Sequence, residues 1–256
     1  MRAALALTRV QLKIIAHDPW FLVIMFGMPL VIMPVFRQLV GSSLVGSGYE
    51  GATGAELVVP GQMVLFGFFV GGSVGFTIFR EHGWKTWDRL RSSAATPRSL
   101  LAGFAIPWIV IHVLYSLALL VVGGLLVGLR LNGGSPVAVM MLLFAYACCV
   151  VALILLATAT FRTVNQLNGL QNVGAMVVGA LGGALVPFEQ LPGWAQAIGP
   201  FTPAYWALKG HRLVFLEQGS AADVLVPTLV LLAAAVVLSV LGVARFRADE
   251  TKEFFA

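Results

Sequence analysis

The chain has 256 residues, of which 59% are hydrophobic and 11% are charged, and its formal net charge is +5. Soluble domains carry about 25% charged residues, so this composition excludes a water-soluble globular protein. Apolar runs of about 20 residues recur along the chain, which is the length that a helix needs to cross a bilayer. These runs lack the strict alternation of barrel strands, so the sequence predicts an all-α integral membrane protein.

The N-terminal segment 1–18 is charged rather than apolar. The first apolar run begins only at Trp20, after a stretch with several basic residues. No small-residue cleavage site stands where a secretory signal would require one. We therefore expect no cleaved signal peptide.

Six apolar runs predict six membrane-spanning helices. They are Trp20–Phe36, Pro60–Phe79, Leu100–Leu129, Val137–Phe161, Leu167–Pro187 and Val224–Ala244. The third would be about 45 Å long as one helix, which exceeds the thickness of a bilayer, so we expect Pro107 to break it. Residues 188–223 form a longer connection with helical patterns of its own, and residues 1–256 are predicted to be a single transmembrane domain.

Basic residues predict the orientation of these spans. If the N-terminus is cytoplasmic, the inside segments hold 12 of the 16 Lys and Arg residues. The other four are Arg37, Arg130, Lys209 and Arg212. The positive-inside rule then places both termini in the cytoplasm. The positive charge follows from this topology, and we expect no nucleic-acid partner.

The loop at residues 80–99, with the sequence REHGWKTWDRLRSSAATPRS, is the longest inside segment between spans. If it is helical from Glu81, then Trp84, Trp87 and Leu90 share one face, and Pro97 ends the segment. One interpretation is an interfacial helix with its tryptophans at the lipid headgroups. The other is a docking helix for a soluble partner, because Trp and Arg often dominate interfaces.

Glycines recur every four residues in the second predicted span, at Gly67, Gly71 and Gly75, and predict a close approach by another helix. The same prediction applies to Gly124 with Gly128 and to Gly179 with Gly183.

Three asparagines, Asn165, Asn168 and Asn172, lie at helical spacing at the start of the fifth span. They could form a polar lining at the inner mouth of a pathway or hydrogen bonds between helices. Both interpretations stay open.

Reactive side chains are scarce inside the predicted spans. We expect His112 to pair with Tyr115 or a carbonyl group rather than to act as a ligand. The adjacent Cys148 and Cys149 are expected to be packing residues, since neighbouring cysteines do not easily form a disulfide. No Asp, Glu, Lys or Arg stands at the centre of a span, which argues against a proton-coupled carrier and leaves a membrane-embedded enzyme with few candidate groups.

Three segments resemble the membrane-spanning subunits of type-2 ATP-binding-cassette exporters. They are HDPWFLVIMFGMPLVIMPVF (17–36), REHGWKTWDRLRSSAATPRSLL (80–101) and LVPFEQLPGWAQAIGPFTPAYWALKGHR (185–212). Their order, together with six predicted spans and the length of the chain, carries the resemblance, which covers most of the sequence.

The resemblance implies roles for several segments. Residues 1–18 would form an amphipathic elbow helix at the inner membrane surface, and residues 188–223 would form short helices that re-enter the membrane from outside. Residues 80–99 would contain the coupling helix that contacts an ATPase subunit. The residues implied for that contact are Arg80, Glu81, Gly83, Trp84 and Trp87.

The sequence has no G-x-x-x-x-G-K-[ST] phosphate-binding loop, so ATP and Mg²⁺ are expected to be bound by a separate ATPase subunit. The expected function is that of a permease subunit in the bacterial plasma membrane. It would pair with a second permease chain, contact membrane lipid and export a hydrophobic, drug-like or lipid-linked molecule. Export of surface polysaccharide or glycolipid, a lipid-modifying enzyme and a non-transporting scaffold are the alternatives.

Overall fold

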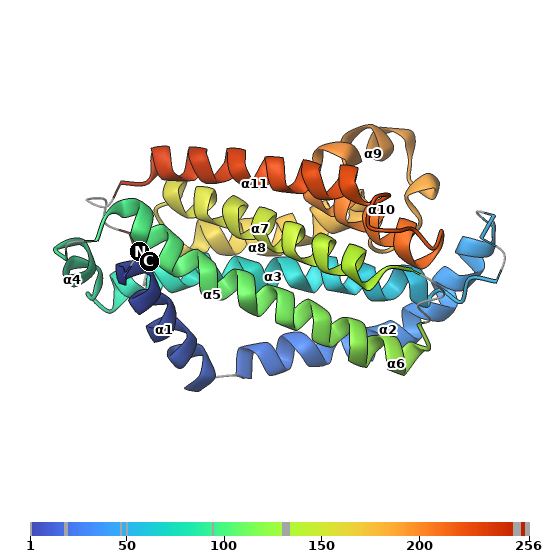
Figure 1. Cartoon of the computed structure of the whole chain (residues 1–256), viewed down its shortest axis with the longest axis horizontal. Coiled ribbons are helices and arrows are strands. Elements are labelled where there is room, and N and C mark those ends of the chain that lie inside the picture. The colour runs from blue at the N-terminus through green and yellow to red at the C-terminus, as the bar shows by residue number, and fades with distance from the viewer. Residues whose placement is uncertain are drawn as a thin grey trace.

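The computed structural model describes residues 2–17, 20–46, 48–49, 51–93, 95–129, 134–247 and 252–253. Its long helices run side by side along the long axis of the molecule (Figure 1). In chain order these are α1 (Arg2–His17), α2 (Trp20–Gly46), α3 (Ala55–Gly83), α4 (Trp87–Arg91), α5 (Pro97–Ala118), the π-helix η1 (Leu119–Gly123), α6 (Gly124–Val127), α7 (Pro136–Thr160), α8 (Val164–Gly182), η2 (Phe188–Gln190), α9 (Gly193–Ile198), η3 (Gly199–Phe201), α10 (Pro203–Phe215) and α11 (Leu225–Arg245). The described part of the chain contains no β-strand, which confirms the all-α prediction.

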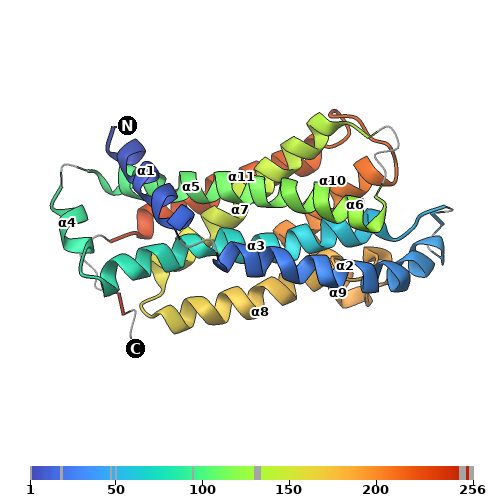
Figure 2. The same cartoon turned by 90° about the horizontal axis from the view of Figure 1, so that it is seen from below.

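Five helical units in the described residues are long and apolar enough to cross a membrane. They are α2, α3, the continuous unit α5–η1–α6, α7 and α11. The remaining predicted span, Leu167–Pro187, corresponds to α8, which is not among the five because its amide side chains lower its mean hydropathy. α8 also ends at Gly182, before the predicted end. It lies along the bundle beside α3 (Figure 2), and its role as a sixth span stays a prediction.

The helix through Pro107 is not broken, contrary to the sequence expectation. Pro107 lies buried inside α5, and the helix continues into η1 and α6. A proline removes one backbone hydrogen bond, and packing against neighbouring helices compensates for this loss in membrane proteins. The irregular part of this helix lies further on, in the π-helical turn at Leu119–Gly123.

Three helices begin at the same local signal, a Ser or Thr followed by Pro. The side chains of Thr96, Ser135 and Thr202 accept hydrogen bonds from backbone N–H groups three residues later. The following prolines occupy the first helical turn, where they lose no hydrogen bond. This signal explains why α5 begins at Pro97, three residues before the predicted span.

α3 is the centre of the bundle. It packs against α2, α5, α7, α8 and α10. In its most apolar 18-residue window 83% of residues are buried, whereas the corresponding share for α2 is 11%. α2 therefore exposes an apolar face that must meet lipid or another chain.

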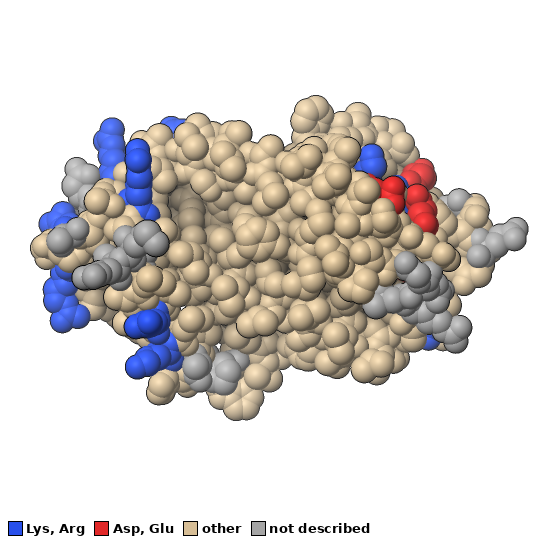
Figure 3. Space-filling view, viewed as in Figure 1, with Lys and Arg blue, Asp and Glu red and all other residues tan. Residues whose placement is uncertain are grey.

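On the face shown in Figure 3, charged residues gather at the two ends of the molecule, and the middle carries almost none. The end that carries α4 is rich in Lys and Arg, and acidic side chains lie towards the opposite end. Such a division is typical of a protein that spans a bilayer with one basic side.

Candidate functional site

The charged loop at 80–99 does not form one helix from Glu81. α3 continues to Gly83, and the chain then turns at Lys85, which has a left-handed φ of 58°. The Trp84 N–H donates to the Arg80 carbonyl at 2.9 Å, and the Thr86 N–H donates to the Glu81 carbonyl at 3.0 Å. These bonds close α3 and allow the short helix α4 to start in a new direction.

The turn separates the two tryptophans that the sequence placed on one face. Trp84 is 56% exposed, whereas Trp87 is 4% exposed. Trp87 stacks on His82 with ring centroids 4.4 Å apart and meets Phe246, beyond α11, edge-on at 5.8 Å. The shared face was therefore a wrong prediction, because a left-handed residue between the tryptophans breaks the helical register.

Glu81 is held inside the protein rather than presented to a partner. Its side chain is buried and accepts a hydrogen bond from Gln11 of α1 at 3.3 Å. The Thr86 hydroxyl also donates to the Glu81 carboxylate. Glu81 thus joins α1, α3 and the turn before α4.

The outer surface of this region is formed by an aromatic ring and basic groups. The Arg80 guanidinium lies 4.9 Å from the centre of the Trp84 ring, within the range of cation–π attraction. Lys85, the next residue in the chain, and Arg89 of α4 are exposed as well. Of the five residues predicted for a partner contact, the structure exposes Trp84, half-buries Arg80 and Gly83, and buries Glu81 and Trp87. Lys85 and Arg89 were not among the predicted contacts, although their alternation with the tryptophans was a usable signal.

The asparagines Asn165, Asn168 and Asn172 all lie on the exposed face of α8. The Asn172 amide donates to the Asn168 carbonyl at 3.0 Å, along α8 itself. The bond that crosses between helices comes from Gln171, which is buried and donates to the Phe69 carbonyl of α3 at 2.6 Å. Further along this face Val173 and Met176 are exposed, so α8 presents amide and apolar groups together.

Side chains of the same chain fill the glycine face of α3. A Cβ atom on Gly71 would lie 2.8 Å from His112 Nδ1, and one on Gly75 would lie 2.6 Å from Leu167. Gly67 faces the same histidine, His112. The predicted close packing is therefore packing within the protein. Gly128 and Gly183 differ from this prediction, because both have positive φ angles and close helices.

His112 lies fully buried between α3, α5 and α7. Its ring meets Tyr146 edge-on, with centroids 5.5 Å apart, and neither ring nitrogen has a hydrogen-bond partner among the described residues. The expected partner Tyr115 instead donates to the Met25 carbonyl at 2.8 Å. The expected pairing of His112 is therefore wrong, and tight packing takes its place.

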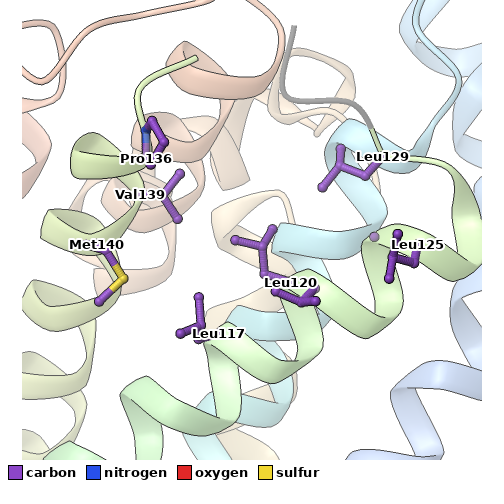
Figure 4. Close-up of a pocket in the computed structure, with 9 residues that line it drawn as sticks. Leu117, Leu120, Leu125, Leu129, Pro136, Val139 and Met140 are labelled. Carbon is purple, nitrogen blue, oxygen red and sulfur yellow. The ribbon is translucent and has the colours of Figure 1, made fainter. Parts of the chain in front are cut away.

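An apolar pocket of about 330 Å³ lies between the α5–η1–α6 unit and the first turns of α7 (Figure 4). Leu117, Leu120, Leu125, Val139 and Met140 are among the nine residues that line it, and all nine are apolar or glycine. No group of three or more His, Cys, Asp or Glu in the described residues could hold a metal ion. The described residues of this lining therefore offer no side chain for catalysis.

Comparison with known families decides where this architecture belongs. The family described as ABC-2 type transporter matches residues 2–216. The chain belongs to the ABC-2 type transporter family. The matched residues run from α1 to the end of α10 and include the α4 turn and the asparagine face of α8.

One relative in this family has a name that describes resistance. The chain is 26% identical over 201 residues to the linearmycin resistance permease protein LnrN of Bacillus subtilis (strain 168). The alignment covers 78% of this chain and 52% of the relative. The chain therefore spans about half the length of that relative.

In this ABC-2 family member the connection between α8 and α11 forms the helical segments η2, α9, η3 and α10, as the sequence predicted for residues 188–223. Gln190 of this connection exchanges hydrogen bonds with Ser43 of α2, and Arg212 pairs with Glu189. Lys209 Nζ lies 5.2 Å from the Trp206 ring. The Gln190–Ser43 bonds fasten the connection to α2, and the other two contacts lie within the connection.

Burial raises the pKa of Tyr49, which lies at this end, between α2 and α3. The Arg212 guanidinium acts in the opposite direction, and the Glu217 carboxylate adds to the increase. Tyr49 is therefore neutral at physiological pH, and its hydroxyl donates to Glu217 at 3.4 Å.

Proposed function

We propose that the protein is the permease subunit of an ATP-driven exporter of hydrophobic, drug-like amphiphiles. It forms the pathway together with a second permease chain in a bacterial plasma membrane, with both termini in the cytoplasm. Membership of the ABC-2 type transporter family and the resistance named for the relative support this proposal.

The exposed face of α8 is the observation that carries the substrate class. Asn168 and Asn172 provide amide groups, and Val173 and Met176 provide apolar surface on the same helix. Sites for amphiphilic ligands combine a mainly apolar lining with a few polar groups that set orientation. α8 would line the pathway between the two permease chains.

ATP hydrolysis and its Mg²⁺ belong to separate ATPase subunits in this proposal. Trp84, Lys85 and Arg89 are exposed at the basic end and form the surface that would receive such a subunit. Trp and Arg are enriched among residues that contribute most to binding. Trp87 and Glu81 would act behind this surface by positioning α4 against α3, α1 and Phe246.

The test is export of amphiphilic drugs and fluorescent dyes from a drug-sensitive bacterium that expresses the protein with its ATPase subunit. We expect lower accumulation and higher resistance than in cells with an ATPase subunit whose phosphate-binding lysine is substituted. Equal accumulation in both strains across the panel, with the complex present in the membrane, would contradict the proposed substrate class.

A further inference from the structure

A second pocket, of about 290 Å³, lies where α7 and α11 end at the basic side of the molecule. Arg162, Arg245 and Arg247 line it together with Ala159, Thr160 and Ala244. The three arginines are exposed, and they reach the pocket from the α7–α8 linker and from the end of α11. Three arginines in the lining of one hollow are a combination that suits an anion.

The backbone around Arg162 is fixed on both sides. Its N–H donates to Gln166 Oε1 at 3.0 Å, and its carbonyl accepts from the Glu253 N–H at 2.9 Å. Next to it the Phe161 carbonyl accepts from Lys252 Nζ at 2.8 Å. These hydrogen bonds hold the α7–α8 linker in place, and the linker forms one side of the pocket.

Among the described residues that line the pocket, the charged side chains are all basic. α7 and α11 end here, and the carbonyl end of a helix is equivalent to about −0.5 charge. Lys252 binds the Phe161 carbonyl at the end of α7, which offsets part of this negative partial charge. The Glu253 carboxylate is not among the groups that line the pocket.

An apolar stripe leads into the pocket along α11. Val237, Val240 and Leu241 are 57%, 62% and 49% exposed. Ala244 and Arg245 follow Val240 and Leu241 by four residues, so they lie on the same face of the helix. α7 and α11 are both apolar enough to span a membrane, which places this stripe against lipid chains and the pocket at the headgroup level.

We propose that this pocket binds the phosphate headgroup of an anionic phospholipid, with the acyl chains along the α11 stripe. Arginine recognises phosphate through paired hydrogen bonds, and basic pockets between spanning helices on the cytoplasmic side bind anionic headgroups. The stripe favours lipid over an acidic surface of a protein partner. α4, where the ATPase subunit is proposed to bind, extends beyond the ends of α7 and α11 (Figure 1). The pocket at those helix ends therefore lies nearer to the middle of the molecule than the proposed protein contact.

The test measures lipid binding to the purified full chain in nanodiscs and neutral detergent. Native mass spectrometry would count phosphatidylglycerol and phosphatidylcholine bound to the protein and to the variant R162Q/R245Q/R247Q. The matched control is R89Q/R91Q/R98Q, which removes the same charge from the α4 loop. We expect phosphatidylglycerol affinity to fall about fivefold per arginine in the pocket variant, about 100-fold in all, and less than twofold in the control.

Two further variants keep the result independent of folding. Ala244→Trp fills the pocket with its charges intact and should reduce phosphatidylglycerol binding at least tenfold. Replacement of the three arginines by lysine should retain most binding and a wild-type melting temperature. Inorganic phosphate at millimolar concentration, used as a competitor, separates a lipid site from a site for free phosphate.

Three outcomes would overturn the proposal. The first is equal loss of phosphatidylglycerol in the pocket variant and the control, which would indicate general charge attraction. The second is displacement of the lipid by inorganic phosphate alone. The third is retained lipid binding with loss of the ATPase subunit from the pocket variant, which would assign the arginines to a protein interface.

Discussion

Trp84 and Trp87 are three residues apart and yet belong to different environments. Lys85 turns the chain between them, so one indole faces outwards beside Arg80 and the other fills a space between His82 and Phe246. Their substitutions should therefore have different effects. In the proposed function Trp84 would contact the ATPase subunit, whereas Trp87 packs inside the protein and holds α4 in position.

Trp84→Ala should weaken association with the ATPase subunit by about 30-fold or more, since an interface tryptophan contributes about 2 kcal/mol. Its melting temperature in detergent should stay unchanged. Trp87→Ala should lower the melting temperature, because truncation of a buried Trp costs about 3–5 kcal/mol. Trp194→Ala, which removes an exposed indole at the opposite end, is the control. Identical behaviour of the two single variants would contradict the assignment.

Glycines of α3 are a second feature at this scale. Gly71→Ala should destabilise the protein by about 1–3 kcal/mol, because the new Cβ would lie 2.8 Å from both His112 and Val150. Gly27→Ala in α2 is the matched control, since no atom lies within 4 Å of its Cβ position and alanine favours the helix. Thermal unfolding in detergent measures both. Equal stability of the two variants would show that α3 tolerates a wider spacing here.

At the scale of elements, local signals explain the helix boundaries and packing explains the exceptions. The Ser/Thr–Pro pairs start three helices, whereas the buried Pro107 leaves α5 unbroken. α8 is the helix whose crossing of the membrane stays a prediction. Its amides lower its hydropathy, and one of them, Gln171, is bonded to α3.

The exposed and buried amides of α8 provide a paired experiment. Asn168→Leu with Asn172→Leu should reduce export of the best dye about tenfold, the effect of about 1.4 kcal/mol of lost polar recognition, without loss of stability. Gln171→Leu should lower the melting temperature instead, because it removes the hydrogen bond that joins α8 to the Phe69 carbonyl of α3. Full export by the double asparagine variant would remove α8 from the proposed pathway.

At the scale of the whole molecule, charge is divided between the two ends of an apolar bundle (Figure 3). This division agrees with the count of 12 basic residues against 4 in the sequence. It supports one basic side in the cytoplasm, because Lys and Arg are retained on that side during insertion.

A cysteine at Ser92, which is exposed after α4, should react with an impermeant maleimide only when the cytoplasmic side is open. Ala222→Cys, which is exposed before α11, should react in intact cells. Both belong in a Cys148→Ala, Cys149→Ala background, since the two native thiols are free. Labelling of Ser92→Cys in intact cells would contradict this orientation and place the α4 end outside the cell.

The sequence by itself determined the all-α membrane class, the places of five apolar helices, the helical connection 188–223 and the family. These depend on composition, hydropathy and helical spacing, which are properties of short segments. The boundaries were less well predicted, because α2 and α3 continue beyond the apolar runs that identify them.

Only the tertiary structure decided which residues face outwards. One left-handed residue at Lys85 separated Trp84 from Trp87, and the burial of Glu81 depended on Gln11, 70 residues away in the chain. His112 packs against glycines of α3, and neither of its ring nitrogens has a hydrogen-bond partner among the described residues. Three arginines line one pocket although they come from the ends of two different helices. Such contacts join distant segments, so their physical cause is packing between helices, which no pattern within one segment contains.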